Sequence, residues 1–536
     1  MKRIWGQLTR SAVLIWTFAF WVLSASGSYR FPDPDSLFSL TKFAAMHPDS
    51  LYPAWKESAH HGERGKAFNN LLALYRWRQA TDDNYTLRVV DGRTDSVLVV
   101  RRLTPTQLIQ IPSDPSSRSE WEQIDRLRRA ETRSLVDDFE VRGIPRRDII
   151  VKWGRASEVQ QAQQRDRPFD PYELEWASHF SLSLLATEIS TVETFNDDRL
   201  VSSAGARSRY QFMPDLIERF GLSSFVVPTQ GGSGVRVRPY EHPLHIMEPA
   251  MITMRAYSNA VGHEIPGLSA YHSGPYNIFA IYRAYLSDPY ITAQQSISPL
   301  DAYIWGITSG FETVSQQTSF KNMSRGYVPA LYGSLYLKPV PDFEHEAFRG
   351  IEIAWEGETT YLSTLLKRIT DSTATSDHAA FVRTFKRINT HIAWYDAEAS
   401  SIDPREDLVV RRDERPLTFF LPIHGNNDIP ILPEGINVIR RIAPESVRRT
   451  MVPLPVDLAY QDLVQEVTRF DVSLDTRTRL IDMLDEARKL YAQFPTAYRY
   501  QQLMIMSLHE QIWRSDHFER LVESLAAYNE RFEPSH

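Results

Sequence analysis

The sequence predicts a mainly α fold, with an N-terminal mixed α/β region and C-terminal small α/β and helical regions. Apolar residues recur at three- and four-residue spacing over long stretches, which is the pattern of amphipathic helices. Strand-like runs occur before residue 112 and return, with many prolines, after residue 340. The 536 residues, 42% of them hydrophobic and 24% charged, suit a globular protein with a substantial core.

Composition excludes several classes of function. The net charge of −7 gives no basic footprint, so nucleic acid is not expected as a partner. The chain has no cysteine, which excludes disulfides, thiolate metal ligands and cysteine nucleophiles.

The N-terminus has the order of a secretory signal. Lys2, Arg3 and Arg10 come before the apolar run 12–23, and small residues follow. We therefore expect residues 1–27 to be a signal peptide and the protein to be periplasmic. The alternative is an uncleaved N-terminal anchor, which would be the protein's contact with the membrane, although the run is short for a span.

Residues 28–167 are expected to form an N-terminal accessory region. Apolar spacing predicts a helix over 68–80, and two strands are predicted on either side of the Asp91-Gly92 turn. After a Pro/Ser linker, a second helix is predicted over 119–143, where mixed charges indicate a solvated face. This region contains no residues that suggest chemistry.

Residues 168–340 are expected to be a helical catalytic domain. A buried helix begins after residue 168 and ends near Glu193, and further helices are predicted over 248–262 and after Gly274-Pro275. Glu193 stands where an apolar helix meets a polar loop. Burial at such a place can raise the pKa of a carboxylic acid, so that it protonates a leaving group. From this residue alone, a solvated glutamate at a helix end is the alternative.

Residues 341–470 are predicted to be a mixed α/β region, and residues 471–536 a helical region. Apolar spacing in the latter suits two or more antiparallel helices, which could bind a protein partner. Residues 351–369 and 385–392 faintly resemble a LysM-type glycan-binding module. A plain packing domain is the alternative.

Other motifs give no cofactor or metal site. His242 and His245 flank Pro243, which should break a helix, and no nearby residue completes a zinc site, so no metal is expected. The stretch 230–234 lacks the Lys and Ser/Thr of a phosphate loop and is interpreted as a flexible loop. We therefore expect no cofactor.

Several short motifs in residues 168–340 follow one another in a fixed order. Glu193-Thr194 is followed by Ser-Ala-Gly-Ala at 203–206 and by Gln-Phe-Met-Pro at 211–214. Residues 270–275 read Ala-Tyr-His-Ser-Gly-Pro, and 325–329 read Arg-Gly-Tyr-Val-Pro. Together they resemble the lytic transglycosylases of the lysozyme-like superfamily. That family has Glu-Ser, Ser-x-Ala-Gly-Ala, Gly-Leu-Met-Gln, Ala-Tyr-Asn-Ala-Gly-Pro and a late Tyr-Val element.

The resemblance implies a lysozyme-like catalytic domain that acts on peptidoglycan glycan strands. Glu193 would be the single acid and then the base in cleaving the β-1,4 bond between N-acetylmuramic acid (MurNAc) and N-acetylglucosamine (GlcNAc). The acetamido group of MurNAc would replace a second carboxylate, and its C6 hydroxyl would attack C1 to leave a 1,6-anhydroMurNAc end. The resemblance also implies the substrate-binding residues Thr194, Tyr210, Gln211, Tyr271, His272 and Tyr327.

The chain departs from the family pattern at two places. Ser208-Arg209-Tyr210 replaces Gly-Leu-Met, and His272 replaces an asparagine. If the glycine position has a positive φ, Ser208 would strain the loop, and Arg209 would need to point to solvent. These departures leave two alternatives open. One is a peptidoglycan-binding scaffold with little or no cleavage, and the other is a muramidase that admits water and hydrolyses.

Overall fold

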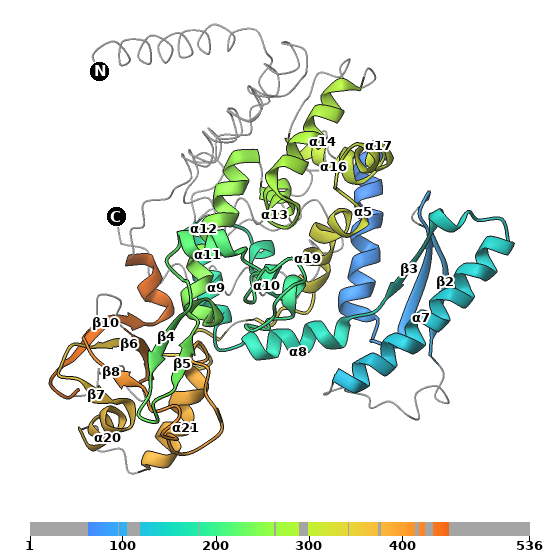
Figure 1. The fold of residues 1–536 in the computed structure, drawn as a ribbon. Coiled ribbons are helices and arrows are strands. Elements are labelled where there is room, and N and C mark those ends of the chain that lie inside the picture. The colour runs from blue at the N-terminus through green and yellow to red at the C-terminus, as the bar shows by residue number, and fades with distance from the viewer. Residues whose placement is uncertain are drawn as a thin grey trace, which may run out of the picture. The chain divides into compact units, whose positions relative to one another are not determined.

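The computed structural model describes most of the chain between residues 63 and 449. Helix outweighs strand in this part, at about 51% against 17%, so the fold is mainly α as predicted (Figure 1). The signal peptide and the C-terminal helices lie outside the described residues, so these predictions stand as predictions. The described ranges are 63–94, 96–103, 118–180, 182–261, 264–288, 299–340, 342–372, 377–412, 417–423 and 432–449.

A three-stranded antiparallel sheet, in the order β2-β1-β3, forms much of the N-terminal region. The predicted hairpin is β1 (Thr86–Asp91) and β2 (Ser96–Arg102), and β3 (Ile149–Trp153) was not predicted. The long helix α7 (Arg118–Val141) packs along this sheet (Figure 1). Apolar side chains hold the two layers together. They are Leu87, Val89, Leu135, Val136, Phe139 and Ile149.

Helix α5 (Glu63–Arg76) comes before this sheet in the sequence but packs against α19 (Tyr327–Leu335) (Figure 1). The two helices approach closely because Gly333 has no side chain. A Cβ at Gly333 would lie 2.5 Å from the carbonyl oxygen of Tyr75. Packing therefore crosses the predicted domain boundary near residue 168, since α5, from the N-terminal region, packs against a helix of residues 168–340.

The buried helix predicted between 168 and Glu193 is three shorter pieces. They are α9 (Asp170–His179), η4 (Leu184–Glu188) and α10 (Ile189–Thr194). The break lies at Ser183, which is the N-cap of η4 and accepts a hydrogen bond from the Leu185 amide through its side chain. A serine that bonds its own backbone competes with a continuous helix.

The remaining helices of residues 168–340 carry the later motifs. α12 (Pro243–Val261) begins five residues earlier than predicted, because proline is well tolerated at the first helical position. Among the described residues, no helix is long and apolar enough to cross a membrane. The other helices are α11 (Pro214–Arg219), α13 (Glu264–Ser273), α14 (Pro275–Ser287), α16 (Pro299–Ile307), α17 (Phe311–Gln317) and α18 (Asn322–Arg325).

The stretch 230–234, which was interpreted as a flexible loop, lies at the turn of a hairpin between β4 (Phe225–Pro228) and β5 (Gly234–Val237). Gly232 has a φ of +74°, which a tight turn between strands often needs. The hairpin shares its apolar core with the region that follows residue 341.

That following region is mixed α/β, as predicted. Its sheet has the order β10-β6-β9, made of β6 (Gly350–Trp355), β9 (Thr418–Pro422) and β10 (Ile436–Ile442). Helices α20 (Leu362–Ser372) and α21 (His378–Ile388) lie between β6 and β9 in the sequence. A two-stranded sheet of β7 (Thr360–Tyr361) and β8 (Val409–Val410) completes it.

Candidate active site

Glu193, His272 and Tyr327 meet at one place from three separate helices. Glu193 is in the last turn of α10, His272 is near the end of α13, and Tyr327 is the first residue of α19. The Nδ1 atom of His272 lies 3.5 Å from Oε1 of Glu193. The His272 ring also stacks on the Tyr327 ring, with centroids 4.4 Å apart and planes at 13°. Residues from three of the sequence motifs are therefore in contact.

The end of α10 fixes the position of Glu193. Phe195 and Asn196 both have left-handed backbone conformations, with φ of 55° and 60°, so the helix stops directly after Thr194. The Asn196 side-chain amide donates a 2.9 Å hydrogen bond to the carbonyl of Ala162, which anchors this turn. The Glu193 side chain remains 14% exposed, so it is neither solvated freely nor sealed in the core.

Two tyrosines, the buried Tyr327 and the half-buried Tyr271, lie near the Glu193 carboxylate. Burial, and then the charge of Glu193, raises the pKa of both Tyr327 and Tyr271 well above the usual value for tyrosine. Both phenols therefore stay protonated and can donate hydrogen bonds. The Tyr327 hydroxyl makes no hydrogen bond of ordinary geometry with any described residue, but a hydrogen-bonding contribution from the Glu193 carboxylate also helps to raise its pKa.

The loop 208–211 is held from both sides. Tyr271 donates a 2.6 Å hydrogen bond from its hydroxyl to the carbonyl of Tyr210, and the Thr194 hydroxyl donates one of 3.0 Å to the carbonyl of Arg209. Ser208 has a φ of +68° and is fully buried, so the strain foreseen at this position is present. Gln211 also has a positive φ, of 50°.

Arg209 does not point to solvent, contrary to expectation. Its side chain is 2% exposed and binds two carboxylates, Asp166 and Asp198, the latter at 2.6 Å. A guanidinium can be buried only where acceptors replace its water, and these two acids supply them. This network could not be foreseen from the sequence, because Arg209 lies in a loop and Asp166 lies 43 residues earlier, at the end of α8 (Ala156–Asp166).

Lys338 is a second buried cation in the helical region. Lys338 contacts Asp170 at 2.5 Å and Glu188 at 3.2 Å. Glu188 is completely buried, and burial raises its pKa to about 7. The role of Glu188 is therefore structural, as a buried partner of Lys338.

Asp166, Asp170 and Glu173 form a compact acidic group. Their oxygens lie within 4.8 Å of one another, as a metal site in this part of the chain would require. Arg209 and Lys338 already neutralise two of these acids, and the Tyr210 hydroxyl donates to Glu173. Two of the three acids are therefore already paired with protein cations, whereas Oε2 of Glu173 has no hydrogen-bond partner among the described residues.

The structure separates the six predicted substrate-binding residues into three groups. Thr194 and Tyr210 are buried, and their hydroxyls are used on Arg209 and Glu173, so they do not face a substrate and that prediction is wrong for them. The Gln211 amide donates to the backbone of Leu200 and Ser208. Tyr271, His272 and Tyr327 surround Glu193 as expected.

Comparison with known proteins adds nothing to this geometry, since no protein-family model and no curated protein matches the sequence.

Proposed function

We propose that this protein is an exported peptidoglycan lytic transglycosylase with a lysozyme-like catalytic domain at residues 168–340. Glu193 protonates the oxygen that leaves C1 of MurNAc. The carboxylate that results then takes the proton of the C6 hydroxyl as that oxygen attacks C1. The glycosidic bond breaks, the C6–O–C1 bond forms, and a 1,6-anhydroMurNAc end is left without consumption of water. No cofactor is needed for these steps.

The state of the Glu193 carboxylate carries this proposal. Within the described residues, no arginine or lysine pairs with Glu193. A fixed cation would stabilise the ionised form and oppose its use as an acid. By contrast, the neighbouring acids Asp166 and Asp198 are bound to Arg209. Glu193 is therefore a carboxyl group at this site that no described arginine or lysine occupies.

The surrounding rings suit a carbohydrate in the cleft. Tyr327 presents a protonated hydroxyl near the carboxylate, where it can donate to Glu193 or to a sugar oxygen. His272 stacks on the buried Tyr327 ring and is itself 23% exposed, so of the two rings His272 is the one that a sugar can reach. Tyr271 holds the loop 208–211 beside it.

His272 favours a second candidate function, which is hydrolysis. An imidazole can accept a proton from water, and its Nδ1 lies 3.5 Å from Glu193. If a water molecule reaches C1 before the C6 hydroxyl does, the product is a reducing end. The chain would then be a muramidase.

The mixed α/β region supports peptidoglycan binding in either case. Along the chain the order is β6, β7, α20, α21, β8 and β9, and β6 pairs antiparallel with β9. This order is compatible with the weak LysM resemblance. If the Glu193 site were inactive, this region could still bind glycan, and the protein would be a scaffold that binds without cleavage.

Turnover of purified peptidoglycan sacculi tests the proposal. The parent protein should solubilise them, and Glu193→Gln should be slower by about 10²–10⁴-fold, because it loses the proton donor. Glu218→Gln is the matched control, since Glu218 is exposed on α11, and it should keep the parent rate. A parent protein that sediments with sacculi but releases nothing would make the protein a scaffold and would contradict the enzymatic proposal.

A further inference from the structure

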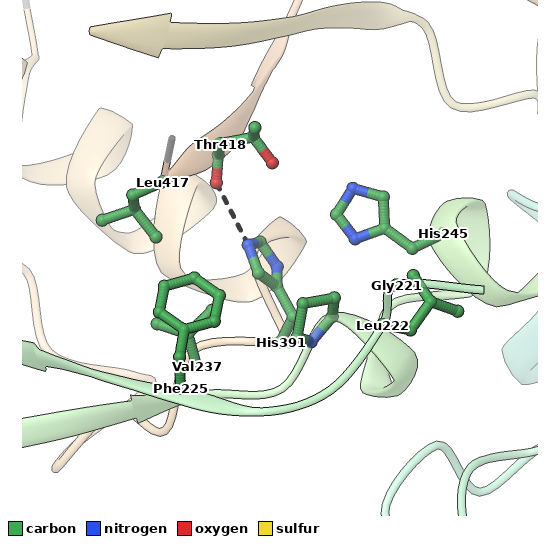
Figure 2. Close-up of a pocket in the computed structure, with 9 residues that line it drawn as sticks. Gly221, Leu222, Phe225, Val237, His245, His391, Leu417 and Thr418 are labelled. Carbon is green, nitrogen blue, oxygen red and sulfur yellow. Dashed lines mark hydrogen bonds between the residues drawn. The ribbon is translucent and has the colours of Figure 1, made fainter. Parts of the chain in front are cut away.

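A second site lies at the start of α12, where a pocket of about 140 Å³ opens between the β4–β5 hairpin and the mixed α/β region (Figure 2). Much of its wall is apolar, with Phe225, Val237 and Leu417 among the lining residues. Two imidazoles, those of His245 and His391, bring polar nitrogen atoms into this lining.

The Nε2 atom of each imidazole is held by a hydrogen-bond acceptor. Nε2 of His245 lies 3.0 Å from Oε1 of Glu352, and Nε2 of His391 lies 3.2 Å from the carbonyl oxygen of Thr418. A carbonyl or a carboxylate can only accept, so in the neutral rings Nε2 carries the hydrogen. The lone pair of each ring is therefore on Nδ1.

Both Nδ1 atoms are buried and have no hydrogen-bond partner among the described residues. The ring centroids are 5.4 Å apart, and the planes are inclined by 75°. Figure 2 shows the two rings beside each other in the lining of the pocket. Each ring therefore keeps a buried lone pair that no described residue satisfies, which is unfavourable unless a donor or a cation binds there.

The third histidine of this cluster is not available as a ligand. His242 donates from Nε2 to the carbonyl of Ile388 at 2.8 Å and accepts at Nδ1 from the amide of Leu244. Its ring stacks on Phe420, with centroids 3.9 Å apart. His242 therefore packs behind the pair, and a bound ion would have two protein ligands here.

We propose that Nδ1 of His245 and Nδ1 of His391 together bind one divalent transition-metal ion of the class that prefers imidazole, such as Zn²⁺. Water or a small ligand in the pocket completes its coordination. Metal-binding histidines in proteins almost always donate their second N–H to a carboxylate or a carbonyl, which is the arrangement of both rings here. Imidazole nitrogen suits Zn²⁺, Cu²⁺ and Ni²⁺, and the pocket supplies the route for entry.

The ion would join α12 to the mixed α/β region, since the two ligands come from these two parts. From the sequence no metal was expected, because Pro243 was taken to break a helix and His391 is distant along the chain. In the structure Pro243 starts the helix, and the β4–β5 hairpin brings His391 close through the bridge between Val237 and Ile392.

Zinc binding by the full, tag-free protein tests the proposal. After chelator treatment, a competition titration with a chromophoric chelator should find one equivalent of Zn²⁺ in the parent that is weakened about tenfold or more in His245→Gln and in His391→Gln. His345→Gln is the matched control, because His345 is 78% exposed and contacts Asp342 elsewhere, and it should bind Zn²⁺ as the parent does. An equal loss of Zn²⁺ affinity in the two pocket variants would distinguish this histidine pair from surface histidines.

A measurement on the unmutated protein guards against variants that fail to fold. The Co²⁺-loaded parent should show two exchangeable, hyperfine-shifted Nε2–H proton resonances, since both rings would bind through Nδ1 and keep Nε2–H. Zn²⁺ should also raise the unfolding temperature of the parent and of His345→Gln. Equal zinc affinity in all variants, or the absence of these resonances, would overturn the proposal and leave a pocket that holds water alone.

Discussion

The hydroxyl of Thr194 donates a 3.0 Å hydrogen bond to the backbone carbonyl of Arg209. This bond joins the residue next to Glu193 to the loop that carries the buried guanidinium. The single hydrogen of this hydroxyl is shared with the carbonyl of Ser190, at 3.1 Å, and its oxygen accepts from the amide of Asp197 at 3.2 Å. Position 194 is therefore a support for the candidate acid and not a contact for substrate.

Replacement of Thr194 by valine should impair this support. The variant keeps the shape of the side chain but removes the hydroxyl, so we expect a loss of about 1–3 kcal/mol in the free energy of unfolding. Because Glu193 would be held less accurately, kcat on sacculi should fall about 10- to 100-fold, with KM little changed. Thr194→Ser keeps the hydroxyl and should retain kcat near that of the parent. Equal kcat in the valine variant would show that this bond does not position Glu193.

Replacement of Arg209 by methionine should be strongly destabilising. Asp166 and Asp198 would keep their buried positions without their cation, which costs about 3–5 kcal/mol in typical buried pairs. Denaturant unfolding would measure this loss in the free energy of unfolding. Arg387→Met is the control, since Arg387 pairs with Glu398 at the surface and its loss should cause no measurable change. Unchanged stability in Arg209→Met would mean that the acids are readily resolvated.

Two variants at Ser208 test the strain at its φ of +68°. Both Ser208→Gly and Ser208→Ala remove the hydroxyl that accepts a 3.3 Å bond from the Tyr210 amide. Only glycine also relieves the left-handed backbone, so Ser208→Gly should be more stable than Ser208→Ala by about 1–2 kcal/mol. Thermal unfolding of the pair gives the difference directly. An alanine variant as stable as the glycine variant would contradict a left-handed conformation here.

Glu264 should make stability depend on pH. Burial raises the pKa of Glu264 in the folded protein to about 7, above the unfolded value of about 4.5. The folded state therefore binds the proton more tightly, so its stabilisation is complete below pH 4.5 and is lost as the pH rises through 7. This change amounts to about 3 kcal/mol. Glu264→Gln should remove it, as unfolding free energies at pH 5 and pH 8 would show. The same slope in the variant would rule out Glu264 as the cause.

The sequence predicted the elements that have a clear period or a clear terminator. The helices α5, α7 and α14 and the β1–β2 hairpin lie close to their expected positions, because apolar spacing and the turn residues decide them locally. β3 and the β4–β5 hairpin were missed. They are short, and they are stabilised by partners distant in the sequence, β1 and the core of the mixed α/β region.

The site could be predicted only where a motif marked it. Glu193, Tyr271, His272 and Tyr327 come together as the order of motifs suggested. The buried residues that hold the site in place could not be predicted, because a buried charged residue cannot be told from a surface one in a sequence. Arg209 was expected in solvent, yet Asp166 and Asp198 allow it to be buried.

The products of peptidoglycan digestion in H₂¹⁸O test the central proposal most directly. Mass spectrometry of the released muropeptides should find 1,6-anhydroMurNAc ends without ¹⁸O from the parent, and none from Glu193→Gln. His272→Asn, which restores the residue of the resembling family, should give the same anhydro ends. Reducing ends labelled with ¹⁸O from the parent would contradict the transglycosylase proposal and would identify a hydrolase.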